Sequence, residues 1–192
     1  MRKIVFDIET SNIFSEVASN SSTDLDLAVV SIYDSQTDSY SSYEQADLPK
    51  LWPILEAADM IIGFNSNSFD LPLLNKYYPG DLNHIKSLDI LDEIKNQYGR
   101  RMKLDQIAAG TLGTQKSGNG LDAVRWWRNG EKEKVISYCE DDVKITKDVY
   151  EYALERGSLK FKEGGKIIEI KLDTSKWEEL LDKPAMTFTL PF

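Results

Sequence analysis

The chain has 192 residues, of which 41% are hydrophobic and 29% are charged, and its formal net charge at pH 7 is -9. This size and composition predict a globular chain of about one ordinary domain and exclude a disordered one. No apolar run approaches the roughly 20 residues that a membrane-spanning helix needs. The acidic balance also argues against a protein that holds nucleic acid by bulk electrostatic attraction.

Cysteine and histidine are too scarce for a disulfide framework or a zinc site. Cys139 is the single cysteine and His84 the single histidine, which excludes an internal disulfide and a Cys/His metal cluster. The sequence begins with strand-like residues rather than an apolar signal region. We therefore expect a cytoplasmic protein without a membrane association.

The first half of the chain predicts a mixed α/β sheet, because apolar and β-branched runs alternate with helical spacing. Asp47 is expected to cap a helix whose apolar face is formed by Leu48, Leu51, Trp52 and Leu55. A short helix is expected over 71–78. Strands are expected over 4–10, 27–33, about 40–43, 60–64 and 85–89.

The second half is predicted to be mainly helical, with a glycine-containing loop at 113–120 that carries Lys116. Helices are expected over 90–98, 104–112, 121–129 and 131 to about 156. A terminal hairpin is expected from 159–161 and 167–170, joined through Gly164 and Gly165. We expect two units, with residues 1–158 forming the sheet domain and residues 159–192 forming a small β-hairpin appendage, a short helix and a tail.

Acidic residues stand out in three separate segments. Asp7 and Glu9 are two apart on the first strand, so their side chains point to the same face. Asp70 follows a polar loop at the start of a helix. Tyr138 and Asp142 are four apart on the long helix and therefore stack on one side of it. Because bare buried charge is costly, such acids must be solvated, paired with cations or bound to a metal.

Each member of this set also has a simpler explanation when it is taken alone. The first-strand acids could face water, and Asp70 could be a helix N-cap. Tyr138 could be an aromatic residue at the edge of the core. Asp142 could pair with Lys144 or Lys147. The occurrence of all these residues in order, on suitable elements, favours a nuclease site.

This pattern resembles the DEDD superfamily of 3′–5′ exonucleases, which have a ribonuclease H-like fold. Phe-Asp-Ile-Glu-Thr at 6–10 looks like its first motif, Asn-x-x-x-Phe-Asp at 65–70 its second, and Tyr-x-x-x-Asp at 138–142 its third. The tyrosine resembles the DEDDy branch, because the histidine branch would need a histidine where Ser137 stands. The resemblance spans residues 1–156 and is nearest to stand-alone YprB-like exonucleases and to proofreading domains of family B polymerases.

The resemblance implies a ribonuclease H-like fold, a mixed five-stranded sheet flanked by helices, and a two-metal mechanism. Asp7, Glu9, Asp70 and Asp142 would hold two divalent ions, Mg²⁺ or Mn²⁺, with Asp7 as the bridge. Tyr138 would orient the attacking water. The expected activity is metal-dependent hydrolysis of single-stranded or frayed DNA or RNA from the 3′ end. The alternatives are a non-catalytic nucleic-acid- or partner-binding module and an endonuclease on the same fold.

Further residues are weaker candidates for substrate contact. The resemblance implies that Thr10 contacts the terminal nucleotide, and Asn65 and Lys116 could also touch substrate. Trp126 and Trp127 could stack on bases, although at least one of them is expected in the core. Candidates for phosphate contact are Arg100, Arg101, Lys103, Lys116, Arg125 and Arg128.

The segment Phe188–Phe192 presents apolar groups at the end of the sequence. It resembles the short peptides that bacterial proteins insert into the sliding clamp, although Thr187 stands where such peptides have glutamine. The alternative is that it packs as a strand against its own domain.

Overall fold

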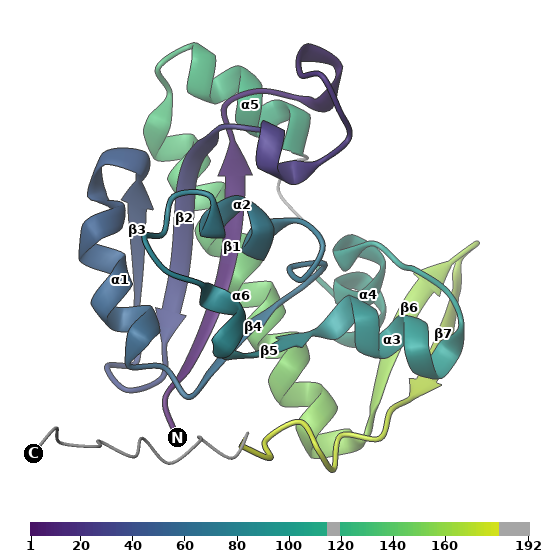
Figure 1. Cartoon of the computed structure of the whole chain (residues 1–192). Coiled ribbons are helices and arrows are strands. Elements are labelled where there is room, and N and C mark those ends of the chain that lie inside the picture. Colours follow the sequence, from purple (N-terminus) through teal and green to yellow (C-terminus); the bar gives the residue numbers. More distant parts are fainter. Residues whose placement is uncertain (115–119, 181–192) are drawn as a thin grey trace, which may run out of the picture.

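The computed structural model describes residues 1–114 and 120–180 (Figure 1). Two predictions fall outside these ranges, namely the substrate contact of Lys116 and the partner contact of Phe188–Phe192. Both stay predictions.

A mixed five-stranded sheet forms the centre of the molecule, in the order β3-β2-β1-β4-β5. The central strand β1 is antiparallel to β2 and parallel to β4, and β4 is parallel to β5. The predicted five-stranded α/β sheet is confirmed. The strands are β1 (Lys3–Thr10), β2 (Leu27–Asp34), β3 (Ser39–Glu44), β4 (Met60–Gly63) and β5 (Lys86–Asp89).

Helices cover both faces of the sheet (Figure 1). Alternation along β1 decides which side chain goes to which face. Phe6 packs into the core formed with α1 (Leu48–Glu56) and α2 (Asp70–Asn75). Val5 packs into the opposite core, formed with the helices α3 (Ile90–Tyr98), α4 (Leu104–Thr111) and α6 (Lys132–Arg156). Among the described residues, no helix is both long and apolar enough to cross a membrane.

Two local predictions in the first half need correction. Asp47 occupies the N-cap position of α1 as predicted, but its side chain makes no capping hydrogen bond, because a 3-10 turn leads directly into the helix and leaves Asp47 in a helical conformation (φ -96°, ψ -3°) rather than an extended one. Its carboxylate binds Lys50 at 2.6 Å instead. The second helix ends at Asn75 rather than at 78. Pro79 follows, and it disfavours a helical conformation at the residue before it.

The terminal hairpin is confirmed as β6 (Ser158–Glu163) paired with β7 (Lys166–Lys171). It shares its core with the sheet, since Leu159 and Phe161 lie in the same apolar cluster as Val5. Thr111 at the end of α4 fastens it, with its hydroxyl donating to the Lys160 carbonyl and accepting from the Lys160 amide. The expected boundary at residue 158 therefore falls between segments whose side chains pack together.

Beyond the hairpin, residues 172–180 run back to the start of β1. Trp177 stacks on Tyr150 of α6 with 6.0 Å between ring centroids. Glu178 accepts hydrogen bonds from Lys3 at 2.7 Å and from the Tyr150 hydroxyl at 2.9 Å. The short helix expected beyond residue 158 is not found among these described residues, which form turns.

A substitution at Gly110 tests the close packing of α4 against the hairpin. A Cβ at this position would lie 2.5 Å from the Phe161 Cα and 2.6 Å from the Lys160 carbonyl carbon. Since both are backbone atoms that cannot rotate away, we expect Gly110→Ala to lower the free energy of unfolding by about 1–3 kcal/mol despite the better helix propensity of alanine. Urea unfolding followed by circular dichroism measures this.

Gly120→Ala is the matched control, because a Cβ there meets nothing within 4 Å. We expect that variant to unfold at the same urea concentration as the parent or slightly above it. Equal stability of both variants would contradict the tight packing of α4 on β6.

Candidate active site

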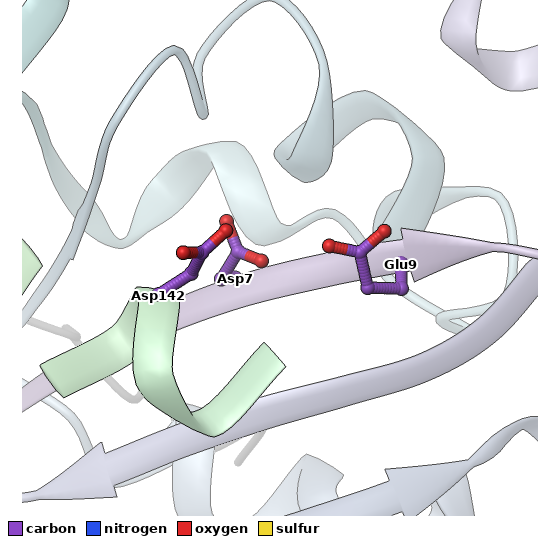
Figure 2. A group of neighbouring side chains, drawn as sticks. All are labelled: Asp7, Glu9 and Asp142. Atoms are coloured by element: carbon purple, nitrogen blue, oxygen red, sulfur yellow. The ribbon is translucent and has the colours of Figure 1, made fainter. Parts of the chain in front are cut away.

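Three carboxylates from β1 and α6 converge beside the central strand. One oxygen each of Asp7, Glu9 and Asp142 lies within 4.8 Å of the others. Figure 2 shows Asp7 and Glu9 side by side on β1, with Asp142 reaching toward Asp7 from α6. Glu9 is 8% exposed and Asp142 is 3% exposed, so this is a largely dry acidic cluster rather than a solvated face.

Apolar contacts hold α6 across β1 and β2, and these contacts place Asp142. Val143 packs into the core that contains Val5, while Val135 and Cys139 pack with Val29 of β2. The predicted inward stripe of the long helix is thus seen in the structure. Asp142 points inward with it, which excludes its pairing on the solvated face.

Asp70, the fourth predicted metal ligand, is not part of this group of three carboxylates, but its side chain binds the backbone of β1. The two parallel strands β1 and β4 pair only over Lys3–Val5 and Met60–Ile62, so the amides further along β1 need other acceptors on that side. The Ile8 amide donates to Asp70 Oδ1 at 3.1 Å. Asp70 is therefore not the N-cap of α2. Phe69 takes the cap position, and the Asp70 carboxylate is used by β1.

Burial and neighbouring negative charges both raise the pKa of Asp70. Its pKa is raised to about 7, mainly because burial removes the carboxyl group from water, and also because the carboxylates of Asp89 and Asp142 repel its charge. Amide hydrogen bonds, including the one from Ile8, act in the opposite direction. Repulsion from Asp142 shows that Asp70 lies in the electrostatic field of the same cluster.

Two α6 residues line the cluster together with Asp142. Tyr138, one turn before Asp142, is 4% exposed, and its ring meets Trp126 edge-on with 6.1 Å between centroids. The Cys139 thiol donates to the backbone oxygen of Asp7 at 3.3 Å and contacts Asp7 Oδ2 at 3.6 Å. Trp126 thus supports Tyr138 rather than offering a free face to a base.

Asp89 was not among the predicted site residues, yet it organises the loop that leads to Asp70. Its carboxylate accepts from the amides of Asn65 at 2.7 Å, Asn67 at 2.9 Å and Leu91 at 2.9 Å. It therefore caps α3 and holds the loop at the same time. An aspartate directly before a helical run, followed three residues later by Asp92, is an N-cap signal that could have identified the first of these roles.

Asn65 occupies the left-handed region (φ 68°) at the start of this loop. Its side-chain oxygen accepts from the Ser68 hydroxyl at 2.9 Å and from the Arg101 guanidinium. These bonds let Asn65 hold the loop, while its predicted contact with substrate stays a prediction. They also bring Arg101 next to the loop that carries Asp70.

An apolar pocket of about 540 Å³ lies on the Glu9 side of the cluster. Glu9 and Thr10 line it together with apolar side chains that include Phe14, Phe69 and Leu121. The Thr10 hydroxyl donates to the Asn12 carbonyl at 2.9 Å and so fixes the chain where it leaves β1.

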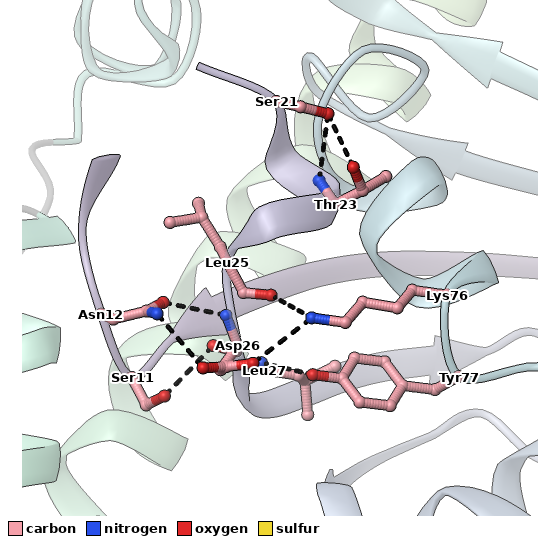
Figure 3. A network of polar contacts seen from close by, with 9 residues as sticks. All are labelled: Ser11, Asn12, Ser21, Thr23, Leu25, Asp26, Leu27, Lys76 and Tyr77. Carbon is pink, nitrogen blue, oxygen red and sulfur yellow. Dashed lines mark hydrogen bonds and ion pairs between the residues drawn. The ribbon is translucent and has the colours of Figure 1, made fainter. Parts of the chain in front are cut away.

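The loop that bounds this pocket is fastened to α2 and its continuation (Figure 3). Asn12 bonds the Asp26 backbone amide at 2.8 Å and its carboxylate at 3.2 Å. Lys76 donates to the Leu25 carbonyl at 2.8 Å and pairs with Asp26 at 3.3 Å. The Leu27 amide donates to the Tyr77 hydroxyl at 3.2 Å. The pocket wall is therefore held by polar contacts from two segments.

A second cleft, of about 590 Å³, lies on the Tyr138 side of the cluster. Arg101 and Lys103 line it. Three other cations that were predicted to contact phosphate do not line it and form ion pairs elsewhere, namely Arg100 with Glu163, Arg125 with Asp122 and Arg128 with Glu16.

The donor set suits a hard divalent cation. Asp7, Glu9 and Asp142 supply carboxylate oxygens only, which are the ligands that Mg²⁺ and Mn²⁺ prefer. Close carboxylates repel one another at neutral pH, and a bound cation would relieve that repulsion. These residues therefore fit a divalent metal ion.

Comparisons with known proteins agree with this architecture. A family B DNA polymerase from the hyperthermophilic archaeon Pyrobaculum calidifontis has a similar fold, with a TM-score of 0.63 and 18% sequence identity. The match covers 80% of this chain and 24% of the polymerase chain, so the present chain corresponds to about a quarter of that protein. No curated protein matches the sequence. A family model of the RNase H superfamily matches residues 4–154, which include the β1 and α6 residues of the acidic cluster, and the chain therefore belongs to the RNase H superfamily.

Proposed function

We propose that this chain is a metal-dependent 3′–5′ exonuclease of the DEDDy type, related to YprB-like exonucleases. One observation carries the proposal. Segments more than 130 residues apart in sequence bring Asp7, Glu9 and Asp142 within 4.8 Å of one another. Asp70 and Tyr138 lie beside them. A buried cluster of like charges is costly unless it serves to bind a cation.

In this proposal, Asp7, Glu9, Asp70 and Asp142 would hold two divalent ions, Mg²⁺ or Mn²⁺. When bound, the ions activate water and neutralise charge on the leaving oxygen. Tyr138 orients the attacking water through its hydroxyl. The water oxygen forms a bond to phosphorus, and the bond from phosphorus to the 3′ oxygen of the preceding nucleotide breaks. The products are a nucleoside 5′-monophosphate and a strand with a new 3′ hydroxyl.

The apolar pocket beside Glu9 supports an enzyme that acts at strand ends. A pocket of about 540 Å³ is large enough for one nucleoside, and Thr10 and Glu9 are among the residues that line it. A base lying in it cannot remain paired within a duplex, which favours single-stranded or frayed ends. The alternative of a non-catalytic binding module does not require the oxygen-only donor set of Asp7, Glu9 and Asp142.

Replacing Asp142 should abolish hydrolysis without unfolding the protein. We expect Asp142→Asn to lower the rate of 3′-end shortening of a 5′-labelled oligonucleotide by about 10³-fold or more, because a ligand to the proposed metal site is lost. Product ladders on a denaturing gel, with Mn²⁺ present, measure the rate. Asp141→Asn, on the exposed side of the same helix, is the matched control and should retain the parent rate. A fully active Asp142→Asn variant would refute the assignment.

Tyr138 should affect the rate but not metal binding. We expect Tyr138→Phe to lower kcat by about 10–10²-fold, because the hydroxyl that orients the water is removed while the ring keeps its contact with Trp126. The melting temperature in Mn²⁺ should rise as much as in the parent. A purely structural tyrosine would instead lower the melting temperature and leave kcat unchanged.

Asp70 should make the stability of the metal-free protein fall as pH rises. Its carboxyl has a pKa of about 7 when folded and about 3.9 when unfolded. Between these values the folded state binds more protons, so the free energy of unfolding should decline from pH 4 to pH 7 and level off above it. In EDTA we expect Asp70→Asn to reduce this decline by about 1–3 kcal/mol, measured by urea unfolding at pH 5, 6, 7 and 8.

Two controls accompany that measurement. Asp89, whose pKa is also raised by burial, should leave part of the decline in the Asp70→Asn variant. Asp47→Asn, at an exposed ion pair, should leave the full decline. Adding Mn²⁺ should weaken the decline in the parent, since a cation favours the ionised carboxylates. An unchanged decline in Asp70→Asn would contradict the burial of this charge.

A further inference from the structure

The cleft on the Tyr138 side of the acidic cluster carries two basic side chains in a regular pattern. Arg101 and Lys103 are exposed, whereas Met102 and Leu104, which alternate with them, are 4% and 8% exposed and anchored in the core. Lys103 has an extended backbone (φ -83°, ψ 147°), so alternate side chains point the same way. Both basic residues therefore line one cleft, together with Tyr138.

These two cations differ from most others in their partners. Within the described residues, neither Arg101 nor Lys103 forms an ion pair, and the Arg101 guanidinium donates to the neutral Asn65 amide oxygen. The cleft also contains Asp105, so its described lining has two positive charges and one negative charge. The other arginines all bind carboxylates, in the pairs Arg2–Asp34, Arg100–Glu163, Arg125–Asp122, Arg128–Glu16 and Arg156–Glu155.

We propose that this cleft binds the sugar–phosphate backbone of the substrate strand on the 5′ side of the scissile bond, with Arg101 and Lys103 contacting its phosphates. The proposal rests on the proposed exonuclease function and adds the path of the strand. In a chain with a net charge of -9, phosphate contacts have to be local. Exposed cations without carboxylate partners are the groups that can make them.

The apolar pocket and the cleft that contains Arg101 and Lys103 also set the direction of the strand. Its terminal nucleotide has one base and only the scissile phosphate, so an apolar pocket such as the one beside Glu9 suits it. The remaining strand carries a negative charge at every nucleotide and needs basic side chains. The cleft that contains Arg101 and Lys103 is also lined by Tyr138, which lies one turn before Asp142 on α6. The strand therefore runs from this cleft, across the carboxylates, to the apolar pocket.

Arg101 also ties the strand path to the catalytic loop. Its guanidinium bonds Asn65, and the Asn65 amide bonds Asp89 at 2.7 Å. The same loop ends at Asp70, whose carboxylate reaches the Ile8 amide. Arg101 is thus placed where it can contact a phosphate while remaining part of the loop's frame, and Lys103 contributes charge without such a bond.

Substrate length separates this proposal from general damage to the enzyme. A thymidine decanucleotide extends through the cleft, whereas the dinucleotide TpT has only the scissile phosphate and does not reach Arg101 or Lys103. We expect the double variant Arg101→Ala/Lys103→Ala to lower kcat/KM for the decanucleotide by about 10-fold or more. Its kcat/KM for TpT should fall much less, because the only bond lost there is the one from Arg101 to Asn65. The single variant Lys103→Ala, which removes charge from the cleft without touching that loop, should keep kcat/KM for TpT within about twofold of the parent.

Arg100→Ala/Lys162→Ala is the matched control, because it removes the same charge from residues outside the cleft, including the arginine paired with Glu163. This control should leave both substrates unaffected. An equal loss on both substrates in the cleft variant would overturn the strand path, as would no loss on either. The exonuclease function would stand in both cases. A parent enzyme that digests neither substrate would instead refute the exonuclease function.

A binding measurement tests the cleft independently of turnover. On an Asp142→Asn background, fluorescence anisotropy of a labelled thymidine decanucleotide gives the association constant as a function of salt. The cleft variant should bind at least about 10-fold more weakly, and the slope of log K against log salt should be shallower by about 1.4, since two contacts contribute about 0.7 each. An unchanged slope would overturn the proposal even if turnover fell.

Discussion

The hydrogen bond from the Ile8 amide to Asp70 joins the fold of this protein to its acidic cluster. Strand β4 ends at Gly63 and pairs with β1 only as far as Val5, which leaves β1 amides in need of acceptors. A buried amide without an acceptor is costly. Asp70 supplies one and thereby places a carboxylate beside the strand that carries Asp7 and Glu9. The early separation of two parallel strands is what opens room for the site.

The surrounding structure has to hold these carboxylates together against their repulsion. Apolar clusters on both sheet faces fix β1 and α6, and three amide bonds to Asp89 fix the loop before Asp70. Cys139 donates to Asp7 from α6. Burial and neighbouring charge raise the pKa of Asp70, so ionising that carboxyl is locally unfavourable. Such local cost, paid by good packing elsewhere, is characteristic of functional sites.

Local patterns in the sequence predicted the elements well, because each depends on neighbours in the chain. Alternation predicted β1, and helical spacing predicted the inward stripe of α6. They also predicted that Asp7, Glu9, Asp70 and Asp142 could meet, and the structure groups three of these, namely Asp7, Glu9 and Asp142.

Contacts between distant segments could not be predicted in the same way. Asp70 has the sequence context of a helix cap, but its partner lies on β1, 62 residues away. Asp47 has the same context, yet it pairs with Lys50. Whether a basic residue such as Arg101 or Arg100 has a carboxylate partner also depends on tertiary structure, since Glu163 reaches Arg100 from the terminal hairpin.

The pairing of cations resolves the apparent conflict between an acidic chain and a polyanionic substrate. An excess of negative charge repels a nucleic acid at long range, but salt screens that repulsion within about 10 Å. At shorter range, a basic residue can bind a phosphate only if a carboxylate does not already neutralise its charge. Where a carboxylate already binds an arginine, the pair offers a phosphate little net charge, whereas Arg101 and Lys103 stand in the cleft without such a pair among the described residues. In the proposed exonuclease, the cleft that contains Arg101 and Lys103 would therefore supply the local phosphate contacts that the net charge of the chain does not.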